Sequence, residues 1–217
     1  EILIKISKLP AFGLDPGSGE LSVQEIEEED WANSWKKYFV PTKVSKDMIV
    51  VPSWENYTPE TGETVIDMDP GMAFGTGTHE TTKLCVQAIE DYLRPQDTVI
   101  DVGCGTGILS IVAAKEGAGK VIGVDFDPVA IKTAGENSVK NGTDDVIELY
   151  EGNLLDSVDP ELRADMVVAN ILAQAIVTLT PEGTNVVKVG GIFFSSGFIT
   201  EFLPDVLDAL EQECFVI

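Results

Sequence analysis

Three glycines spaced two residues apart carry the clearest chemical signal in the sequence. The stretch "VIDVGCGTG", residues 99–107, is an apolar segment that ends in Asp101 and continues into Gly103, Gly105 and Gly107. Because glycine has no side chain, the backbone can approach a ligand closely, and the amino end of a following helix offers N–H donors. We therefore expect a cofactor against this loop. The alternative is a glycine turn that serves packing alone.

The spacing of these glycines separates two classes of cofactor. A dinucleotide fingerprint reads GxGxxG, but here the third glycine comes one residue early. With Asp101 ahead of it, the loop resembles the first motif of class I S-adenosylmethionine-dependent methyltransferases. The early glycine therefore favours S-adenosylmethionine over NAD, and a dehydrogenase remains a more distant alternative.

A carboxylate at the end of the next predicted strand supports an adenosine ligand. Asp125 ends "VIGVD", where a carboxylate can accept hydrogen bonds from both ribose hydroxyls. NAD enzymes share this feature, so it does not choose between the cofactors. Phe126 follows and can pack on the adenine face. Asn153 lies after the third strand, where an amide can bond the adenine amino group or merely belong to an ordinary loop.

An asparagine ends the fourth predicted strand, in "VVANILA", residues 167–173. Class I enzymes that methylate nitrogen often carry Asn or Asp followed by Pro-Pro-aromatic at this place, and its oxygens hold the acceptor amine. This chain keeps Asn170 but has Ile171 and Leu172 in place of the prolines. The missing aromatic removes a platform for stacking a flipped base. We expect Asn170 to orient an acceptor amine, and the departures after it weaken the case for an exocyclic amine of a nucleic-acid base.

The loop "DPGMAFGTGTHETT", residues 69–82, holds three glycines, four threonines and the only histidine of the chain. It lacks the GK[ST] ending of a phosphate loop. We expect its glycines to let it fold over the methionine end of the cofactor, with Phe74 among the cofactor contacts. A helix that begins near Thr78 would carry Thr82 to the pocket.

His79 in this loop has two possible roles. A neutral imidazole can remove a proton from the acceptor amine, which makes His79 a candidate catalytic base. The alternative, which we favour, places it in the first turn of the helix, solvated or bonded to the carboxylate of the cofactor. Methyl transfer from a sulfonium can proceed with loss of the proton to water.

The elements that must position these residues alternate between strand and helix from residue 97 onward. Short apolar segments separated by helices are typical of a parallel sheet that is buried on both faces. We predict a doubly wound, mostly parallel Rossmann-like α/β fold with helices on both faces and a ligand beyond the carboxyl ends of the strands. The predicted strands are 98–102, 120–125, 146–152, 164–170 and 191–197, and the predicted helices are 107–116, 128–141, a stretch after 171 and about 200–212.

The first 66 residues have a different pattern. The segment 21–27 alternates like a strand, and Trp31 and Trp35 lie four apart on one face of a short helix, more typical of packing than of chemistry. Two further short strands are predicted within 47–54 and 63–70.

Composition limits the possible partners and the compartment. The net charge is −23, with 14 scattered Lys and Arg residues, so we expect no direct contact with nucleic acid. A basic partner fits, although the acidity can also serve solubility alone. No apolar run approaches the roughly 20 residues that a membrane span requires. Three cysteines without a CxxC pair fit a reducing cytosol.

Four segments together are similar to the PrmA family, which methylates ribosomal protein L11. They are "DPGMAFGTGTHETT", "VIDVGCGTGILS", "VIGVDFDPVAI" and "VVANILA", in this order and spacing. The resemblance implies S-adenosylmethionine as methyl donor, S-adenosylhomocysteine as product, no metal, and N-methylation of lysine side chains and the terminal amino group. It places cofactor contacts at Thr82, Gly103, Asp125 and Asn170, to which we add Gly105, Phe126 and Phe74.

The same resemblance suggests how the chain is organised. Residues 1–29 look like the last part of an amino-terminal substrate-recognition domain of α+β type, and residues 30–66 look like a linker helix with short strands. Residues 67–217 form the expected methyltransferase domain, whose carboxyl end is expected to be incomplete. We expect a cytoplasmic monomer with a basic ribosomal protein as substrate.

Two other classes of function stay open at this point. One is a class I methyltransferase that acts on a small molecule or a nucleic acid. The other is a binding scaffold without catalysis, against which the intact glycine loop and Asp125 argue.

Overall fold

The computed structural model describes residues 2–15, 17, 18, 36, 39–69, 77 and 79–217. The chain divides into two compact units, residues 1–39 and 40–217. The first unit contains a short helix α1 (Ile2–Ile6) and a 3-10 helix η1 (Leu9–Phe12). The strand predicted within 21–27 and the helix predicted around Trp31 and Trp35 lie outside the described residues. The assignment of residues 1–29 to a recognition domain stays a prediction.

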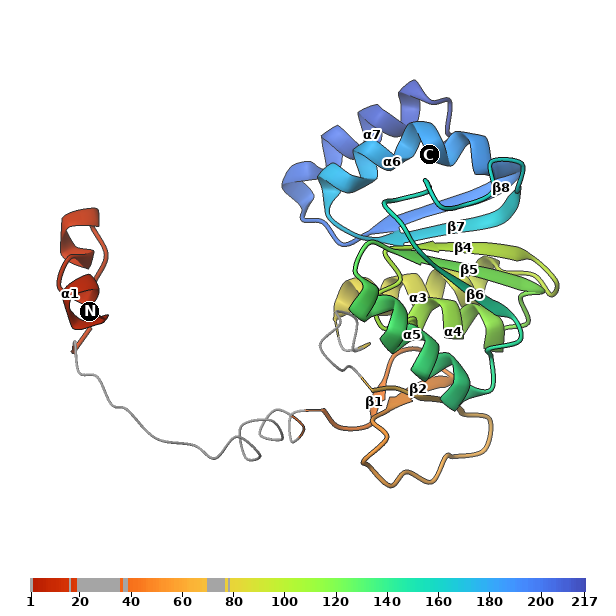
Figure 1. Ribbon diagram of the computed structural model, residues 1–217, viewed down its shortest axis with the longest axis horizontal. Coiled ribbons are helices and arrows are strands. Elements are labelled where there is room, and N and C mark those ends of the chain that lie inside the picture. Colours follow the sequence, from red (N-terminus) through yellow and green to blue (C-terminus); the bar gives the residue numbers. More distant parts are fainter. Residues whose placement is uncertain (1, 16, 19–35, 37–38, 70–76, 78) are drawn as a thin grey trace. The chain divides into compact units, whose positions relative to one another are not determined.

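The second unit is built on a five-stranded sheet in which all neighbouring strands are parallel, in the order β6-β5-β4-β7-β8 (Figure 1). The chain enters at β4, proceeds outward through β5 and β6, and then returns to the other side of β4 with β7 and β8. The strands are β4 (Thr98–Val102), β5 (Lys120–Asp125), β6 (Ile147–Glu151), β7 (Ala164–Asn170) and β8 (Val187–Ser196).

Helices cover both faces of this sheet. Figure 1 shows α3, α4 and α5 on one face and α6 and α7 on the other. The predicted doubly wound parallel sheet is thereby confirmed. The helices are α3 (Glu80–Tyr92), α4 (Ile108–Lys115), α5 (Pro128–Asn141), α6 (Ala173–Val186) and α7 (Leu203–Gln212), and a 3-10 turn η3 (Thr200–Phe202) precedes α7.

Alternation along each strand explains why the central strands read as continuous apolar runs. Val99 and Val121 belong to the core cluster that includes α3 and α4 side chains, whereas their neighbours Ile100 and Ile122 belong to the cluster on the other face. Successive strand residues point to opposite faces, and both faces are covered here. A central parallel strand therefore needs apolar residues at nearly every position.

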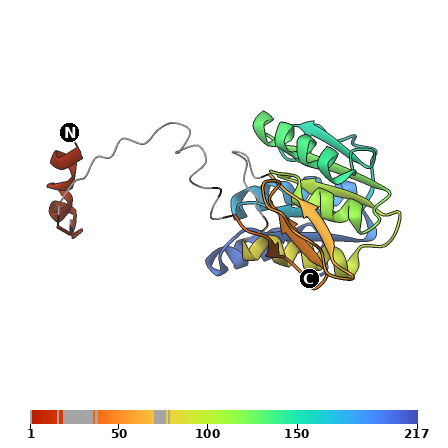
Figure 2. The ribbon, with the colours of Figure 1, turned by 90° about the horizontal axis from the view of Figure 1, so that it is seen from below.

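A second, three-stranded sheet packs beside the helices on the α3–α5 side. It contains β1 (Thr42–Lys43), β2 (Met48–Val51) and β3 (Thr64–Asp67), with β1 antiparallel and β3 parallel to β2. Figure 2 shows this sheet in front of the helices of that face, where β3 contacts α4 and α5. Met48 and Ile66 join the core cluster of that face, so this sheet extends the core of the second unit.

Capping signals explain which element boundaries the sequence predicts well. Helix α5 occupies 128–141 as predicted, because Asp127 accepts from Val129 N at its start and Gly142 ends it with φ +63°. Helix α3 begins at Glu80, two residues after the predicted start, because His79 is its N-cap. Strand β8 begins at Val187, four residues before the predicted start, since α6 leads into it directly.

Within the described part of the chain, no helix combines the length and apolarity that a membrane span requires.

Candidate functional site

The predicted site residues gather where β4 and β7, neighbours in the sheet, both end. The chain reverses its direction of travel across the sheet between these two strands. The loops that follow them therefore diverge to opposite faces, which leaves room for a ligand at the carboxyl ends. The glycine loop follows β4, Asp125 ends β5, and Asn170 ends β7. The fold thus brings together residues that lie far apart in the sequence.

Each glycine of the loop is required by backbone geometry. Gly103, Gly105 and Gly107 have φ of +73°, +55° and +80°, a region that residues with a Cβ rarely adopt. A Cβ on Gly103 would come well under 3.0 Å from Cγ2 of Ile171, and a Cβ on Gly107 would lie 3.0 Å from Cβ of Ala134. The loop therefore lies directly against the residue that follows Asn170 and against α5.

The N–H groups of this loop are engaged within the protein. Gly103 and Cys104 donate to the Val124 carbonyl at 2.8 and 3.0 Å. Gly105 N donates to Asp125 Oδ2 at 2.9 Å, and Gly107 N donates to the Cys104 carbonyl at 2.8 Å. The glycine motif predicts that N–H groups of the loop, and those at the start of the next helix, are donors for a ligand. The N–H groups of these four residues already have partners within the protein. What the glycines offer a ligand is therefore a close approach to the backbone.

Asp125 links the loop to the end of β5. Its carboxylate is 9% exposed, and its oxygens accept from Gly105 N at 2.9 Å and from Asp127 N at 3.0 Å. A carboxylate has about four lone-pair sites, so these two bonds leave capacity for two hydroxyl donors. The side chain is held in place from both sides and can accept from a diol, as the sequence predicts for a ribose.

Asn170 presents an acceptor that no residue of the described chain satisfies. Its Nδ2 donates to Thr82 Oγ1 at 3.2 Å, and its Oδ1 is buried without a hydrogen-bond partner. Thr82 lies in the first turns of α3 and is 1% exposed. A buried carbonyl-type oxygen without a donor costs about 1–3 kcal/mol. The arrangement is therefore suited to receive an N–H donor from a bound molecule.

Asp101 holds the start of α4 beneath the glycine loop. Its Oδ2 accepts from Ser110 N at 3.0 Å and from Ser110 Oγ at 2.7 Å, while Oδ1 is buried without a partner in the described residues. Burial raises the pKa of this carboxyl to about 6; the charge of Asp125 adds to the rise, and the bonds from Ser110 oppose it. One N–H at the amino end of α4 is thus used by Asp101.

His79 acts as the N-cap of α3. Its backbone is extended, and its Nδ1 lies 3.3 Å from Thr81 N and 2.7 Å from Thr81 Oγ1. An N-cap side chain satisfies one of the free N–H groups in the first turn of a helix. This placement agrees with the favoured alternative, in which His79 belongs to the helix start.

The remaining predicted contacts differ in how the structure places them. Phe126 is 78% exposed directly after Asp125, so its ring is available to a ligand. Asn153 is exposed, and its backbone N donates to Asp156 Oδ1. Phe74 lies outside the described residues. Cys104 is buried, and burial raises the pKa of its thiol above the ordinary value, which keeps it protonated at neutral pH.

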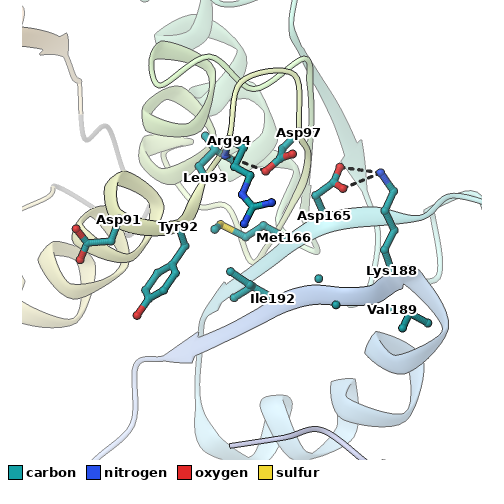
Figure 3. Close-up of a pocket in the computed structure, with 12 residues that line it drawn as sticks. Asp91, Tyr92, Leu93, Arg94, Asp97, Asp165, Met166, Lys188, Val189 and Ile192 are labelled. Atoms are coloured by element: carbon teal, nitrogen blue, oxygen red, sulfur yellow. Dashed lines mark hydrogen bonds and ion pairs between the residues drawn. The ribbon is translucent and has the colours of Figure 1, made fainter.

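A cavity of about 280 Å³ lies at the opposite edge of the sheet, at the amino ends of β4, β7 and β8 (Figure 3). Lys188 and Asp165, both among the residues that line it, point toward each other in Figure 3, and Lys188 Nζ lies 2.8 Å from both carboxylate oxygens. Asp97 accepts from Arg94 N at 2.9 Å. The Asp165–Lys188 contact joins the starts of β7 and β8, and the Arg94–Asp97 contact lies just before β4. The residues that line the cavity include none of the predicted site residues.

The structure adds residues that sequence reasoning missed. Asn141 and Asn137, four apart on α5, bond to the backbone of Asp67, the last residue of β3, and of Asp69, two residues beyond it. The available signal was the pair itself, because asparagine is a poor helix former. Two of them at this spacing inside a predicted helix indicate partners outside the helix.

Comparisons with known proteins identify the family of the chain. The family model described as Ribosomal protein L11 methyltransferase (PrmA) matches residues 2–217. A curated relative of that name from Alkaliphilus oremlandii is 50% identical over 205 residues, covering 94% of this chain and 65% of the relative. Another from Clostridium botulinum is 49% identical, covering 96% of this chain and 66% of the relative. This chain thus spans about two thirds of the length of these relatives.

Solved structures give the same result. The crystal structure of ribosomal protein L11 methylase from Lactobacillus delbrueckii subsp. bulgaricus matches with a TM-score of 0.77 and 36% identity, covering 82% of this chain and 91% of that chain. A precorrin-6y C5,15-methyltransferase from Geobacter metallireducens shares the fold at a TM-score of 0.56 and 16% identity, covering 64% and 74%. With a family model that matches almost the whole sequence, the chain belongs to the ribosomal protein L11 methyltransferase (PrmA) family.

Proposed function

We propose that the chain is an S-adenosylmethionine-dependent protein N-methyltransferase whose acceptors are lysine side-chain and terminal amino groups of ribosomal protein L11. One observation carries this proposal: the buried Oδ1 of Asn170, which has no donor in the described chain and lies at the carboxyl end of β7 beside the glycine loop. An amine that must be methylated supplies the missing N–H. Family membership supports both the reaction and the substrate.

The residues present fit the proposed cofactor. Asp125 retains acceptor capacity for the two ribose hydroxyls, and the exposed ring of Phe126 can stack on adenine. The turns at Gly103 and Gly105 allow the backbone to approach the methionine part closely. When bound, the cofactor supplies an electrophilic methyl group on a sulfonium. We propose Phe74 as a further contact, and no metal.

Asn170 and Thr82 orient the acceptor. Because Asn170 Nδ2 donates to Thr82 Oγ1, the amide is fixed with Oδ1 directed away from Thr82. Oδ1 then accepts one hydrogen of the amine, which directs the nitrogen lone pair toward the reacting methyl. Methyl transfer is an in-line displacement, so alignment and exclusion of water are the main tasks of these residues.

The acceptor must lose a proton before it can react. A lysine amine has a pKa of about 10.4 in water, and burial beside a positive charge lowers it. Asn170 offers the amine an uncharged acceptor oxygen, which favours the ammonium form less than a carboxylate would. His79 stays a candidate base, but its Nδ1 is engaged at the start of α3. We propose that the proton leaves to water.

The charge of the chain suits a basic protein partner. A net charge of −23 attracts a basic ribosomal protein and repels the phosphates of RNA. We propose that the protein acts in the cytoplasm as a monomer, without direct contact to nucleic acid or membrane. Residues 1–29 are proposed to contribute to recognition of the protein substrate.

Isothermal titration calorimetry and a methylation assay test the proposal. We expect the wild type to bind S-adenosylhomocysteine and not NAD, and Asp125→Ala to weaken that binding about 10- to 100-fold, since bonds to a charged group contribute about 1.5–3 kcal/mol. Asn170→Ala should reduce methyl transfer at least about tenfold more than it reduces cofactor binding. Asn185→Ala serves as a control, because Asn185 is exposed on α6. Binding of NAD in preference, or equal transfer by the two asparagine variants, would contradict the proposal.

A further inference from the structure

Two asparagines of α5 bond to the backbone where β3 ends. Asn141 Oδ1 accepts from N of Asp67, the last residue of β3, at 3.0 Å, and its Nδ2 donates to Asp67 O at 2.7 Å. Asn137 repeats this pairing two residues beyond the strand, with Asp69 N and Asp69 O, both at 3.0 Å. Four helical residues rise about 6.0 Å and two extended residues about 6.7 Å. The similar spacings let the two asparagines reach alternate residues of the chain.

Asn137 makes two contacts that Asn141 lacks. Its Nδ2 also donates to the carbonyl of Thr106, in the glycine loop, at 3.0 Å, and it lies 3.0 Å from Met68 Sδ. Asn137 is 0% exposed. Buried polar groups are normally bonded, and leaving one without a partner costs free energy. One buried amide therefore joins the glycine loop to the end of β3.

Thr106 lies at a sensitive point of the loop. It is itself fully buried, and it lies between Gly105, which donates to Asp125 Oδ2, and Gly107, the N-cap of α4 with φ +80°. Fixing the Thr106 carbonyl fixes the peptide plane that joins it to Gly107. The loop is thus held by Asp125 at one residue and by Asn137 at the next.

Asp69, the other residue that Asn137 bonds, is also held by side chains outside α5 and within it. Its carboxylate accepts from Ser53 N at 3.3 Å, and it also bonds to Ser53 Oγ and pairs with Lys140 of α5. Asn137 therefore joins the glycine loop, through Thr106, to a residue that is itself held by Ser53 and Lys140.

We infer that Asn137 is a positioning residue for the cofactor, because it ties the glycine loop to Asp69, whose own position is fixed by Ser53 and Lys140. This inference rests on the proposed function, since the ligand concerned is the proposed S-adenosylmethionine. Asn137 acts through Thr106 and Asp69. Its removal should disturb cofactor binding, whereas removal of Asn141 should disturb only the attachment of β3.

The matched pair of variants Asn137→Leu and Asn141→Leu provides the test. Each exchanges an amide for a side chain of similar size and leaves the backbone N–H and C=O groups of one aspartate without the asparagine, so both should lower the melting temperature. By calorimetry with S-adenosylhomocysteine well below the melting temperature, we expect Asn137→Leu to raise the dissociation constant at least about tenfold and Asn141→Leu less than about twofold. Equal effects of the two variants would overturn the inference. Absence of binding by the wild type would instead contradict the proposed cofactor.

Hydrogen exchange of the wild type decides the matter if either variant fails to fold. The N–H groups of Asp67 and Asp69 are both donated to asparagine side chains of α5. Addition of S-adenosylhomocysteine should increase protection at Asp69 together with residues 103–107, and leave Asp67 unchanged. The same gain at both aspartates, or no gain at Asp69 while the glycine loop is protected, would show that Asn137 does not transmit the contact.

Discussion

Replacing Gly103 with alanine should destabilise the protein by two separable effects. The left-handed φ of +73° costs a residue with a Cβ about 1–2 kcal/mol. The added Cβ would also come well under 3.0 Å from Cγ2 of Ile171. That methyl is bonded directly to the Ile171 Cβ and cannot move without the whole side chain, and such overpacking costs about 1–3 kcal/mol. Together the free energy of unfolding should fall by about 2–5 kcal/mol.

A control glycine and a second substitution separate the two effects. Gly142 has φ +63°, and a Cβ added there would meet nothing within 4 Å, so Gly142→Ala should cost only the backbone part, about 1–2 kcal/mol. Ile171→Ala removes the methyl that Gly103→Ala would meet. In that background, Gly103→Ala should likewise cost only about 1–2 kcal/mol.

Urea unfolding followed by circular dichroism measures all four proteins of this cycle. A coupling energy of about 1–3 kcal/mol between positions 103 and 171 is expected, as for residues in contact. Equal costs for Gly103→Ala and Gly142→Ala, or a coupling energy near zero, would refute the claim that the glycine loop packs against the residue after Asn170.

Three further predictions concern Asp101, the cysteines and His79. Since the folded pKa of Asp101 is raised to about 6, ionisation of this group makes the wild type lose stability as pH rises from about 4 to about 6. In urea unfolding, the free energy of unfolding of Asp101→Asn should therefore rise relative to that of the wild type by up to about 3 kcal/mol between pH 4 and pH 7. A difference between the two proteins that stays constant with pH would refute the raised pKa. A maleimide should label the exposed Cys214 at neutral pH and spare the buried Cys85 and Cys104, whose pKa values are raised chiefly by burial; mass spectrometry of the native protein checks this, and early labelling of Cys104 would contradict it. His79→Ala should lose about 1 kcal/mol of stability as a lost N-cap yet keep measurable turnover, and complete loss of turnover with cofactor binding intact would identify His79 as the base.

The sequence predicts the elements whose signals are local. Strands β4, β5 and β7 have the predicted bounds, because each is a central apolar run that ends in Val102, Asp125 or Asn170. The predicted start of β8 is wrong because Gly190 and Gly191 resemble a turn. Pairing with β7 keeps the preceding residues in the strand, with a register irregularity near Ala164.

The candidate site is predictable where a motif forces a backbone shape, and not where a contact depends on packing between distant segments. The glycine loop and Asp125 are adjacent to strand ends, so spacing alone locates them. The role of Asn137 depends on Asp69, 68 residues away in the sequence; the asparagine pair on α5 indicates partners outside the helix, but no local pattern says which segment supplies them. The engagement of the loop N–H groups by Val124 and Asp125 can likewise be seen only in three dimensions.

The most direct test of the central claim is transfer of a labelled methyl group from S-adenosylmethionine to purified ribosomal protein L11. The assay compares this chain with Asn170→Ala and uses a full-length relative as a positive control. We predict label on lysine side chains or the terminal amino group of L11, strongly reduced in Asn170→Ala. Label on ribosomal RNA, or equal labelling of L11 by the variant, would contradict the account.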